Sequence, residues 1–161
     1  LTDAGYAYGE KTALHRFSLT VERGERIALR GENGCGKSTA VKLLAGELAT
    51  QSGIVQVPGD LRISYLPQNV REIGGTVAEY AAARGAEPAL VMAILNKFNL
   101  RSELFSRLYI WDEPLNFIDL VSRIQIEDLL LEYRPTMLFI EHDAAFCRRV
   151  ATRTVEMFRP Q

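Results

Sequence analysis

The stretch Gly31-Glu32-Asn33-Gly34-Cys35-Gly36-Lys37-Ser38-Thr39 matches G-x-x-x-x-G-K-[S/T], the pattern of a phosphate-binding P-loop. Its glycines allow the backbone to turn so that several N–H groups point at one anion. Lys37 can reach the β- and γ-phosphates of a nucleotide, and the Ser38 hydroxyl can bind Mg²⁺. An apolar run at 27–29 precedes the loop, and a helix is predicted over 38–46. This strand–loop–helix context favours a P-loop over an ordinary glycine-rich turn.

The composition is that of one globular domain. The chain has 161 residues, of which 47% are hydrophobic and 24% are charged, so it can bury a sizeable core. A net charge of −1 gives no bulk electrostatic argument for binding nucleic acid or membrane, although it does not exclude a local basic face. Neither a membrane-spanning apolar run nor a signal peptide is found. Two cysteines form no disulfide framework, which favours a reducing, cytoplasmic setting. Because the chain begins with Leu1, we expect a fragment of a longer protein.

The order of apolar segments predicts an α/β fold. Strands are expected over 17–21, 26–30, 53–57 and 62–66, and more deeply buried strands over 108–111 and 136–140. An amphipathic helix is expected over 120–133, and a short helix after 141–143. The strand-rich first section predicts an antiparallel β part at the N-terminus. Buried strands that alternate with helices predict a mainly parallel sheet flanked by helices, with functional residues at the carboxyl ends of its strands.

Residues 69–106 differ in character from the segments on either side. The stretch 76–84 is rich in alanine, and 87–98 carries apolar residues at helix spacing. We therefore predict a small helical insertion between two strand-rich halves.

Two adjacent carboxylates follow a predicted buried strand. The apolar run 108–111 leads into Asp112-Glu113-Pro114. A carboxylate at this strand end can hold Mg²⁺ beside phosphates, so we assign that role to Asp112. Alternation along the strand points Glu113 in another direction, where it can orient or deprotonate an attacking water. An acidic turn without chemistry is the less favoured interpretation.

Three further side chains are candidates for the same site. Gln68 follows a strand, and its amide can touch both Mg²⁺ and the attacking water, although most loop glutamines are simply solvated. His142 follows the second buried strand, where a neutral imidazole can contact a γ-phosphate. An aromatic side chain near the N-terminus can stack on adenine. Tyr8 is preferred for this role, and Tyr6 is the alternative.

Taken in order, these segments resemble an ABC ATPase nucleotide-binding domain over nearly the whole chain, 1–161. The matching segments are Gly31–Thr39 (Walker A), 65–68 (Q-loop), 108–114 (Walker B), Asp119 (D-loop) and 141–143 (H-switch). The resemblance implies ATP and Mg²⁺ as ligands and ATP hydrolysis as the activity. It implies ATP binding by Tyr8, Asn33, Gly34, Cys35, Gly36, Lys37, Ser38 and Thr39, Mg²⁺ binding by Ser38, Gln68 and Asp112, and catalytic roles for Glu113, His142 and Gln68. Asp119 is expected at the interface with a second ABC domain.

Finer details are similar to the ABC-F class. The segments 63–68, 113–119 and 139–143 look like that class, and Pro-Leu-Asn-Phe-Ile-Asp at 114–119 is similar to its antibiotic-resistance members. Members of this class carry two such domains, have no membrane domain and bind the ribosome. The details most resemble the second, C-terminal domain. The resemblance therefore implies a ribosome-associated factor, with the ATPase subunit of a membrane transporter as the alternative and a nucleotide-binding scaffold without useful catalysis as a third interpretation.

One expected segment of the family is absent. The signature motif, Leu-Ser-Gly-Gly-Gln and its relatives, does not occur, and 101–107 runs directly into the Walker B strand. Seven residues cannot supply both the signature loop and its multi-turn helix. We favour the interpretation that the protein has this segment and the sequence runs on without it. A shortened or degenerate domain is the alternative. Because ABC domains hydrolyse ATP as head-to-tail pairs completed by this motif, the chain alone is expected to bind ATP weakly and hydrolyse it slowly.

Overall fold

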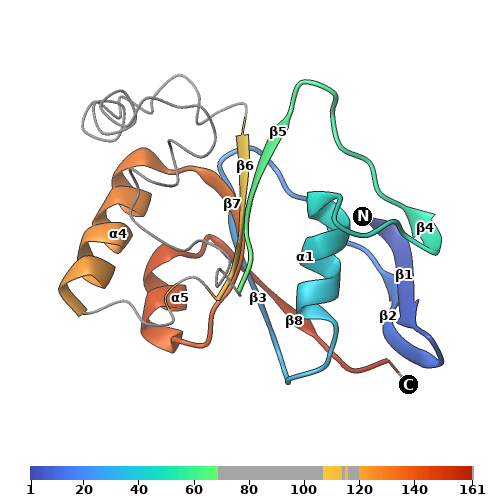
Figure 1. Cartoon of the computed structure of the whole chain (residues 1–161). Coiled ribbons are helices and arrows are strands. Elements are labelled where there is room, and N and C mark those ends of the chain that lie inside the picture. The colour runs from blue at the N-terminus through green and yellow to red at the C-terminus, as the bar shows by residue number, and fades with distance from the viewer. Residues whose placement is uncertain (69–106, 114, 116–119, 161) are drawn as a thin grey trace, which may run out of the picture.

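The computed structural model describes residues 1–68, 107–113, 115 and 120–160. A parallel sheet with the order β5-β6-β7-β3-β8 forms the centre (Figure 1). Its strands are β3 (Arg26–Gly31), β5 (Arg62–Leu66), β6 (Arg107–Asp112), β7 (Thr136–Ile140) and β8 (Arg153–Met157). A smaller antiparallel sheet has the order β2-β1-β4, with β1 (Thr2–Tyr8), β2 (Lys11–Phe17) and β4 (Ser52–Ile54). The helices are α1 (Lys37–Ala45), α4 (Leu120–Tyr133) and α5 (Ala144–Val150).

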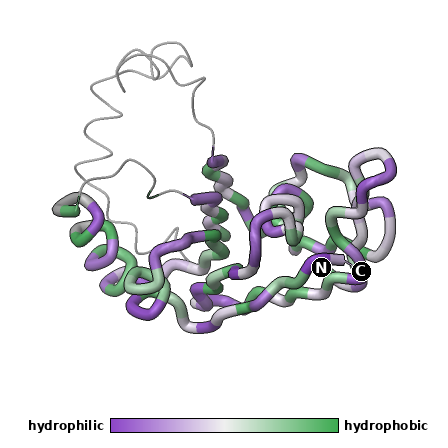
Figure 2. Tube along the Cα trace, turned by 90° about the horizontal axis from the view of Figure 1, so that it is seen from below, coloured by the Kyte–Doolittle hydropathy of each residue, from purple (hydrophilic) through white to green (hydrophobic). Residues whose placement is uncertain are grey.

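The elements are stacked in layers. Helix α1 lies between the two sheets, whereas α4 and α5 cover the opposite face of the parallel sheet (Figure 1). Along α4, hydrophilic and hydrophobic residues alternate from turn to turn (Figure 2). Within the described part of the chain, no helix combines the length and apolar composition needed to cross a membrane.

Strand β7 is the most buried element because both of its faces and both of its edges are covered. All five residues are buried, and β6 and β3 pair with it in parallel register. Alternation along the strand sends Leu138 and Ile140 into the core on the α1 side, and Met137 and Phe139 into the core beneath α5. This two-sided burial explains the uninterrupted apolar sequence of β7.

The predicted fold class is confirmed: a parallel sheet flanked by helices, with an antiparallel part at the N-terminus. The predicted helix 38–46 and strands 62–66, 108–111 and 136–140 match the structure to within a residue at each end. The predicted helical insertion, 69–106, lies outside the described residues.

Two strand predictions near the N-terminus are wrong. The segment 17–21 is not a strand, because the β-hairpin ends at Phe17. Leu19 is buried and its N–H donates to the Leu1 carbonyl, so the alternation reflects a packed connection rather than a sheet ladder. Strand 53–57 is shorter than predicted, since pairing with β1 stops at Ile54. Sequence reasoning also missed β8, which is short, mostly exposed and paired with β3 alone.

Candidate functional site

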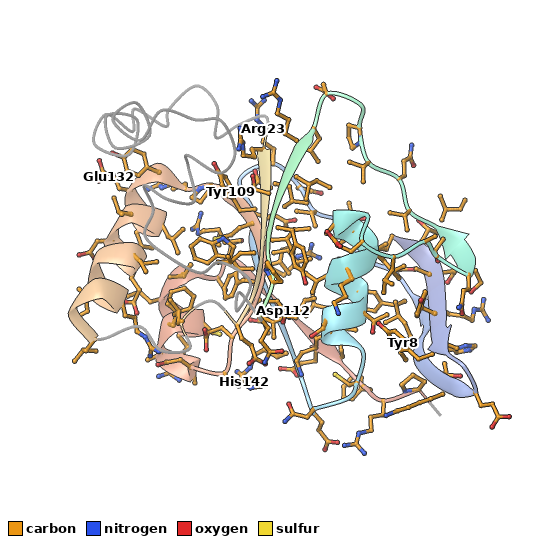
Figure 3. The ribbon with its side chains drawn as sticks, viewed as in Figure 1. Tyr8, Arg23, Tyr109, Asp112, Glu132 and His142 are labelled. Atoms are coloured by element: carbon orange, nitrogen blue, oxygen red, sulfur yellow. The ribbon has the colours of Figure 1, made fainter. Side chains whose placement is uncertain are left out.

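Polar residues meet at one edge of the parallel sheet. Because β3, β5, β6 and β7 run in the same direction, their carboxyl ends share this edge. The P-loop follows β3, Gln68 lies two residues after β5, and Asp112 and Glu113 end β6. His142 lies just after β7. Figure 3 shows Asp112 and His142 at this edge, with Tyr8 across from them on the antiparallel sheet.

The loop between β3 and α1 has the backbone that its glycines were predicted to allow. Gly31, Gly34 and Gly36 have φ values of 143°, 82° and 98°, a region that other residues rarely adopt. Gly36 also lies against the carbonyl oxygen of Ala13 in β2, where a Cβ atom would collide. The loop is therefore fixed both by its own torsions and by its contact with the antiparallel sheet.

Lys37 is held inside the curve of this loop. Its Nζ donates to the carbonyl oxygens of Gly31 at 2.8 Å and Glu32 at 3.0 Å, and the residue is only 7% exposed. Both partners are neutral, so the ammonium charge remains available for an anion bound in the loop.

Ser38 and Asp112 bring two oxygen ligands together. Ser38 Oγ lies 3.4 Å from Asp112 Oδ1, and Asp112 is 2% exposed. Burial raises the pKa of the Asp112 carboxyl, and the Ser38 hydroxyl opposes that shift. A buried carboxylate whose charge is poorly solvated is suited to a cation, which would offset the cost of burial.

Glu113 is the centre of a hydrogen-bonded group at the surface of the site. Its φ of 52° is in the left-handed region, and its N–H donates to the Ile140 carbonyl at 3.0 Å. Gln68 Nε2 donates to Glu113 Oε2 at 2.6 Å, and His142 Nε2 lies 3.1 Å from Glu113 Oε1. The backbone contact between β6 and β7 thus places one carboxylate between an amide and an imidazole.

These groups surround a single cleft of about 470 Å³. Its lining includes Tyr8, Asn33, Gly34, Gly36, Lys37, Ser38, Thr39, Gln68, Glu113 and His142, all of which were predicted as site residues. Tyr8 is 49% exposed and its ring meets Tyr6 edge-on at 4.9 Å, so one aromatic face remains open. The cleft thus combines an aromatic surface, an anion-binding loop and a group of potential catalytic side chains.

Two predicted site residues are not placed in this cleft. The Cys35 side chain is 1% exposed and packs in the core, so any contact with a ligand would come from its backbone. Asp119 lies outside the described residues. Sequence reasoning missed Lys11, which lines the cleft opposite Tyr8 in the hairpin register. A prediction of the hairpin would have found it.

The phosphate loop after β3, the carboxylates after β6 and the parallel sheet define a P-loop nucleotide-binding domain. The family model described as ABC transporter matches residues 14–104, which is more than half of the chain. The chain therefore belongs to the ABC transporter family.

Several relatives align with nearly the whole chain. The ATP-binding protein Uup of Caulobacter vibrioides is 30% identical over 93% of the chain and 30% of its own length. A Uup-like protein of Haemophilus influenzae is 33% identical over 94% of the chain and 40% of its own length. The ribosome protection protein VmlR of Bacillus subtilis is 29% identical over 89% and 31%. The chain thus spans well under half the length of each of these relatives.

The alignments also contain positions that this chain does not fill. The alignment with the Caulobacter protein has 183 positions but uses 93% of the 161 residues, which is about 150, leaving about 33 positions unfilled. Among solved structures, the ATP-binding subunit of an ABC transporter has a TM-score of 0.73 at 22% identity, covering 97% of this chain and 84% of that one. CbiO1 of Clostridium perfringens has a TM-score of 0.70 at 18% identity, covering 97% and 82%. These two likenesses support the fold.

Proposed function

We propose that this chain binds and hydrolyses ATP as one ABC domain of a ribosome-associated ABC-F protein. The observation that carries the proposal is the cleft in which the P-loop faces Glu113, Gln68 and His142. The triphosphate would be bound by the loop N–H groups and Lys37, at the positive end of the α1 dipole. The open face of Tyr8 would stack on the adenine ring.

Mg²⁺ fits the donor set of this site. Ser38, Asp112 and Gln68 offer a hydroxyl, a carboxylate and an amide, and Mg²⁺ prefers oxygen ligands. The Ser38 and Asp112 oxygens are 3.4 Å apart, which is less than twice a typical Mg–O distance of about 2.1 Å, so both can reach one ion. When bound, Mg²⁺ would neutralise charge on the β- and γ-phosphates.

Glu113 is the proposed general base. Only 17% of its side chain is exposed, and it accepts a hydrogen bond from Gln68, which fixes its direction. A carboxylate held in this way can orient a water molecule and remove its proton during attack on the γ-phosphate. His142 lies on the other side of the same carboxylate, where it could contact the γ-phosphate and respond to hydrolysis.

A complete site requires a second ABC domain in head-to-tail pairing, with Asp119 at the interface. The signature motif that such a partner needs in return is absent from this chain. The relatives have about 33 aligned positions that this chain does not fill, and we infer that the signature segment lies among them. ATP-driven pairing would then close the site, and hydrolysis would release it.

The ABC-F assignment is favoured over a transporter subunit by the relatives. Uup and VmlR align over about nine-tenths of the chain at 29–33% identity, whereas the transporter subunits support only the fold. VmlR is named a ribosome protection protein, which supports the ribosome as partner, antibiotic resistance as a possible role and the cytoplasm as location. Separation of lysates into ribosomes and membranes tests the choice. Enrichment with ribosomes in the presence of ATP supports the ABC-F role, and enrichment with membranes supports a transporter.

Replacement of Glu113 by Gln in the full-length protein tests the hydrolytic role. The amide keeps the size of the side chain but cannot accept a proton, so ATP binding should persist while turnover falls on the order of 10²-fold or more. Lys37→Ala should instead weaken ATP binding itself, because the ammonium contacts the phosphates. Unchanged turnover in Glu113→Gln would show that another group is the base.

A further inference from the structure

Glu141 is a buried carboxylate to which the proposed mechanism gives no role. It follows the last residue of β7 and is 6% exposed. It also lines a second cavity of about 320 Å³, together with Lys37 and His142. Glu141 therefore lies immediately behind the catalytic group.

One oxygen of Glu141 shapes the backbone that carries His142. Oε1 accepts hydrogen bonds from the N–H of His142 at 2.7 Å and the N–H of Asp143 at 3.2 Å. A carboxylate that accepts from two successive N–H groups fixes the direction of that peptide segment. Because the imidazole projects from the same segment, this bond also limits where the ring can lie.

The far side of the segment is anchored independently. Asp143 is the N-cap of α5, and its Oδ1 accepts from the N–H groups of Ala145 at 2.7 Å and Phe146 at 3.0 Å. Arg123 of α4 pairs with its other oxygen. His142 thus sits between two anchored residues, although 56% of its own side chain is exposed.

The second oxygen of Glu141 shows that burial is not the purpose of this side chain. Oε2 is buried and has no hydrogen-bond partner in the part of the chain that the structure describes. A buried acceptor without a partner is costly, and an apolar residue would fill the space without that cost. The two N–H bonds of Oε1 give a reason for a carboxylate at this position.

We propose that Glu141 is a positioning residue that holds the His142 imidazole against Glu113. The proposal rests on the proposed function, because it concerns the turnover of that site. Loss of Glu141 should act through His142, so it should reduce the rate of hydrolysis and leave nucleotide affinity unchanged.

The test is a double-mutant cycle in the full-length protein, with kcat, KM and the Kd for a fluorescent ATP analogue measured for each variant. Glu141→Ala should lower kcat roughly ten- to hundredfold, as expected for a misplaced catalytic group, while Kd stays within about twofold. In the His142→Ala background, Glu141→Ala should change kcat by less than about twofold, because the group that it positions is gone.

Glu141→Gln keeps the proposal falsifiable if Glu141→Ala is poorly folded. Its amide oxygen can still accept both N–H bonds, so most of the wild-type kcat should return. A folded Glu141→Gln protein as slow as Glu141→Ala would overturn the proposal, as would an equal loss from Glu141→Ala with and without His142. An inactive wild-type protein would instead contradict the proposed ATPase function, so the two failures are distinguishable.

Discussion

The contact between Gly36 and the antiparallel sheet yields a sharp prediction. Gly36 is the N-cap of α1 with a φ of 98°, and an added Cβ would meet the Ala13 carbonyl oxygen and lie 3.2 Å from Leu14 Cδ1. Gly34 in the same loop has a similar φ of 82° but no atom within 4 Å of its Cβ position. Comparing Gly36→Ala with Gly34→Ala therefore separates the cost of the contact from the cost of the backbone conformation.

The two costs have different sizes. Placing alanine in the left-handed region costs roughly 1–2 kcal/mol in either variant. Gly36→Ala must in addition displace the backbone of β2, and overpacking of this kind costs about 1–3 kcal/mol. For a domain of this size, each 1 kcal/mol lowers Tm by about 2–4 °C. We therefore expect Gly34→Ala to lower Tm by about 2–8 °C and Gly36→Ala by a further 2–12 °C or so.

Scanning calorimetry of the purified variants measures the difference directly. Nucleotide titration of the same samples should show weaker binding for Gly36→Ala, because displacement of the loop moves its N–H groups away from the phosphates. Equal Tm values for the two variants, within about 1 °C, would refute the reasoning, because they would mean that β2 yields to the extra carbon at no cost.

Three further predictions concern stability. Burial raises the pKa of Tyr65 to about 12 and its hydroxyl has no partner among the described residues, so Tyr65→Phe should leave the urea midpoint unchanged or raise stability by up to ~1 kcal/mol; a larger loss would reveal a hidden partner. Asp143→Ala removes the cap of α5 and should cost about 1 kcal/mol at neutral pH. The N–H of Phe146 and other contacts lower the pKa of Asp143, so this contribution is present above its unfolded value of about 3.9 and is lost as pH falls through the folded value. A difference between wild type and Asp143→Ala that stays constant down to acidic pH would contradict this. Phe146 meets Phe139 edge-on at 5.5 Å, so Phe146→Leu should cost about 1–2 kcal/mol in the same denaturation assay. The exposed Phe158→Leu is its control and should change stability by less than about 0.5 kcal/mol.

The parallel half of the fold could be predicted because its signals are local. The P-loop pattern occupies consecutive residues, and β7 reads as an unbroken apolar run because it is covered on both faces. The N-terminal hairpin was missed because its register shifts between Ala4 and Tyr6 and again between Tyr6 and Ala7. Such irregularities break the period of two on which strand prediction depends.

The candidate site was predicted in its parts but not in its connections. The rule that ligands bind at strand carboxyl ends brought Gln68, Glu113 and His142 to one place. Their hydrogen bonds depend on the register between β5, β6 and β7, and no sequence pattern encodes that register. The burial of Glu141 has the same origin, since a lone acidic residue after a strand reads as solvated.

The sheet order has a consequence for how this chain folds as it is made. Strand β3, which supports the P-loop, is paired on both sides by strands from the far end of the chain, with Ile27 opposite Leu138 and Arg153. A nascent chain that has not reached Thr136 has the whole phosphate-loop sequence but neither neighbour of β3. Pairing over such long separations is slow, and synthesis proceeds from the N-terminus. Assembly of the nucleotide pocket therefore waits for the last strands to emerge, so an interrupted chain is left with a P-loop that nothing supports.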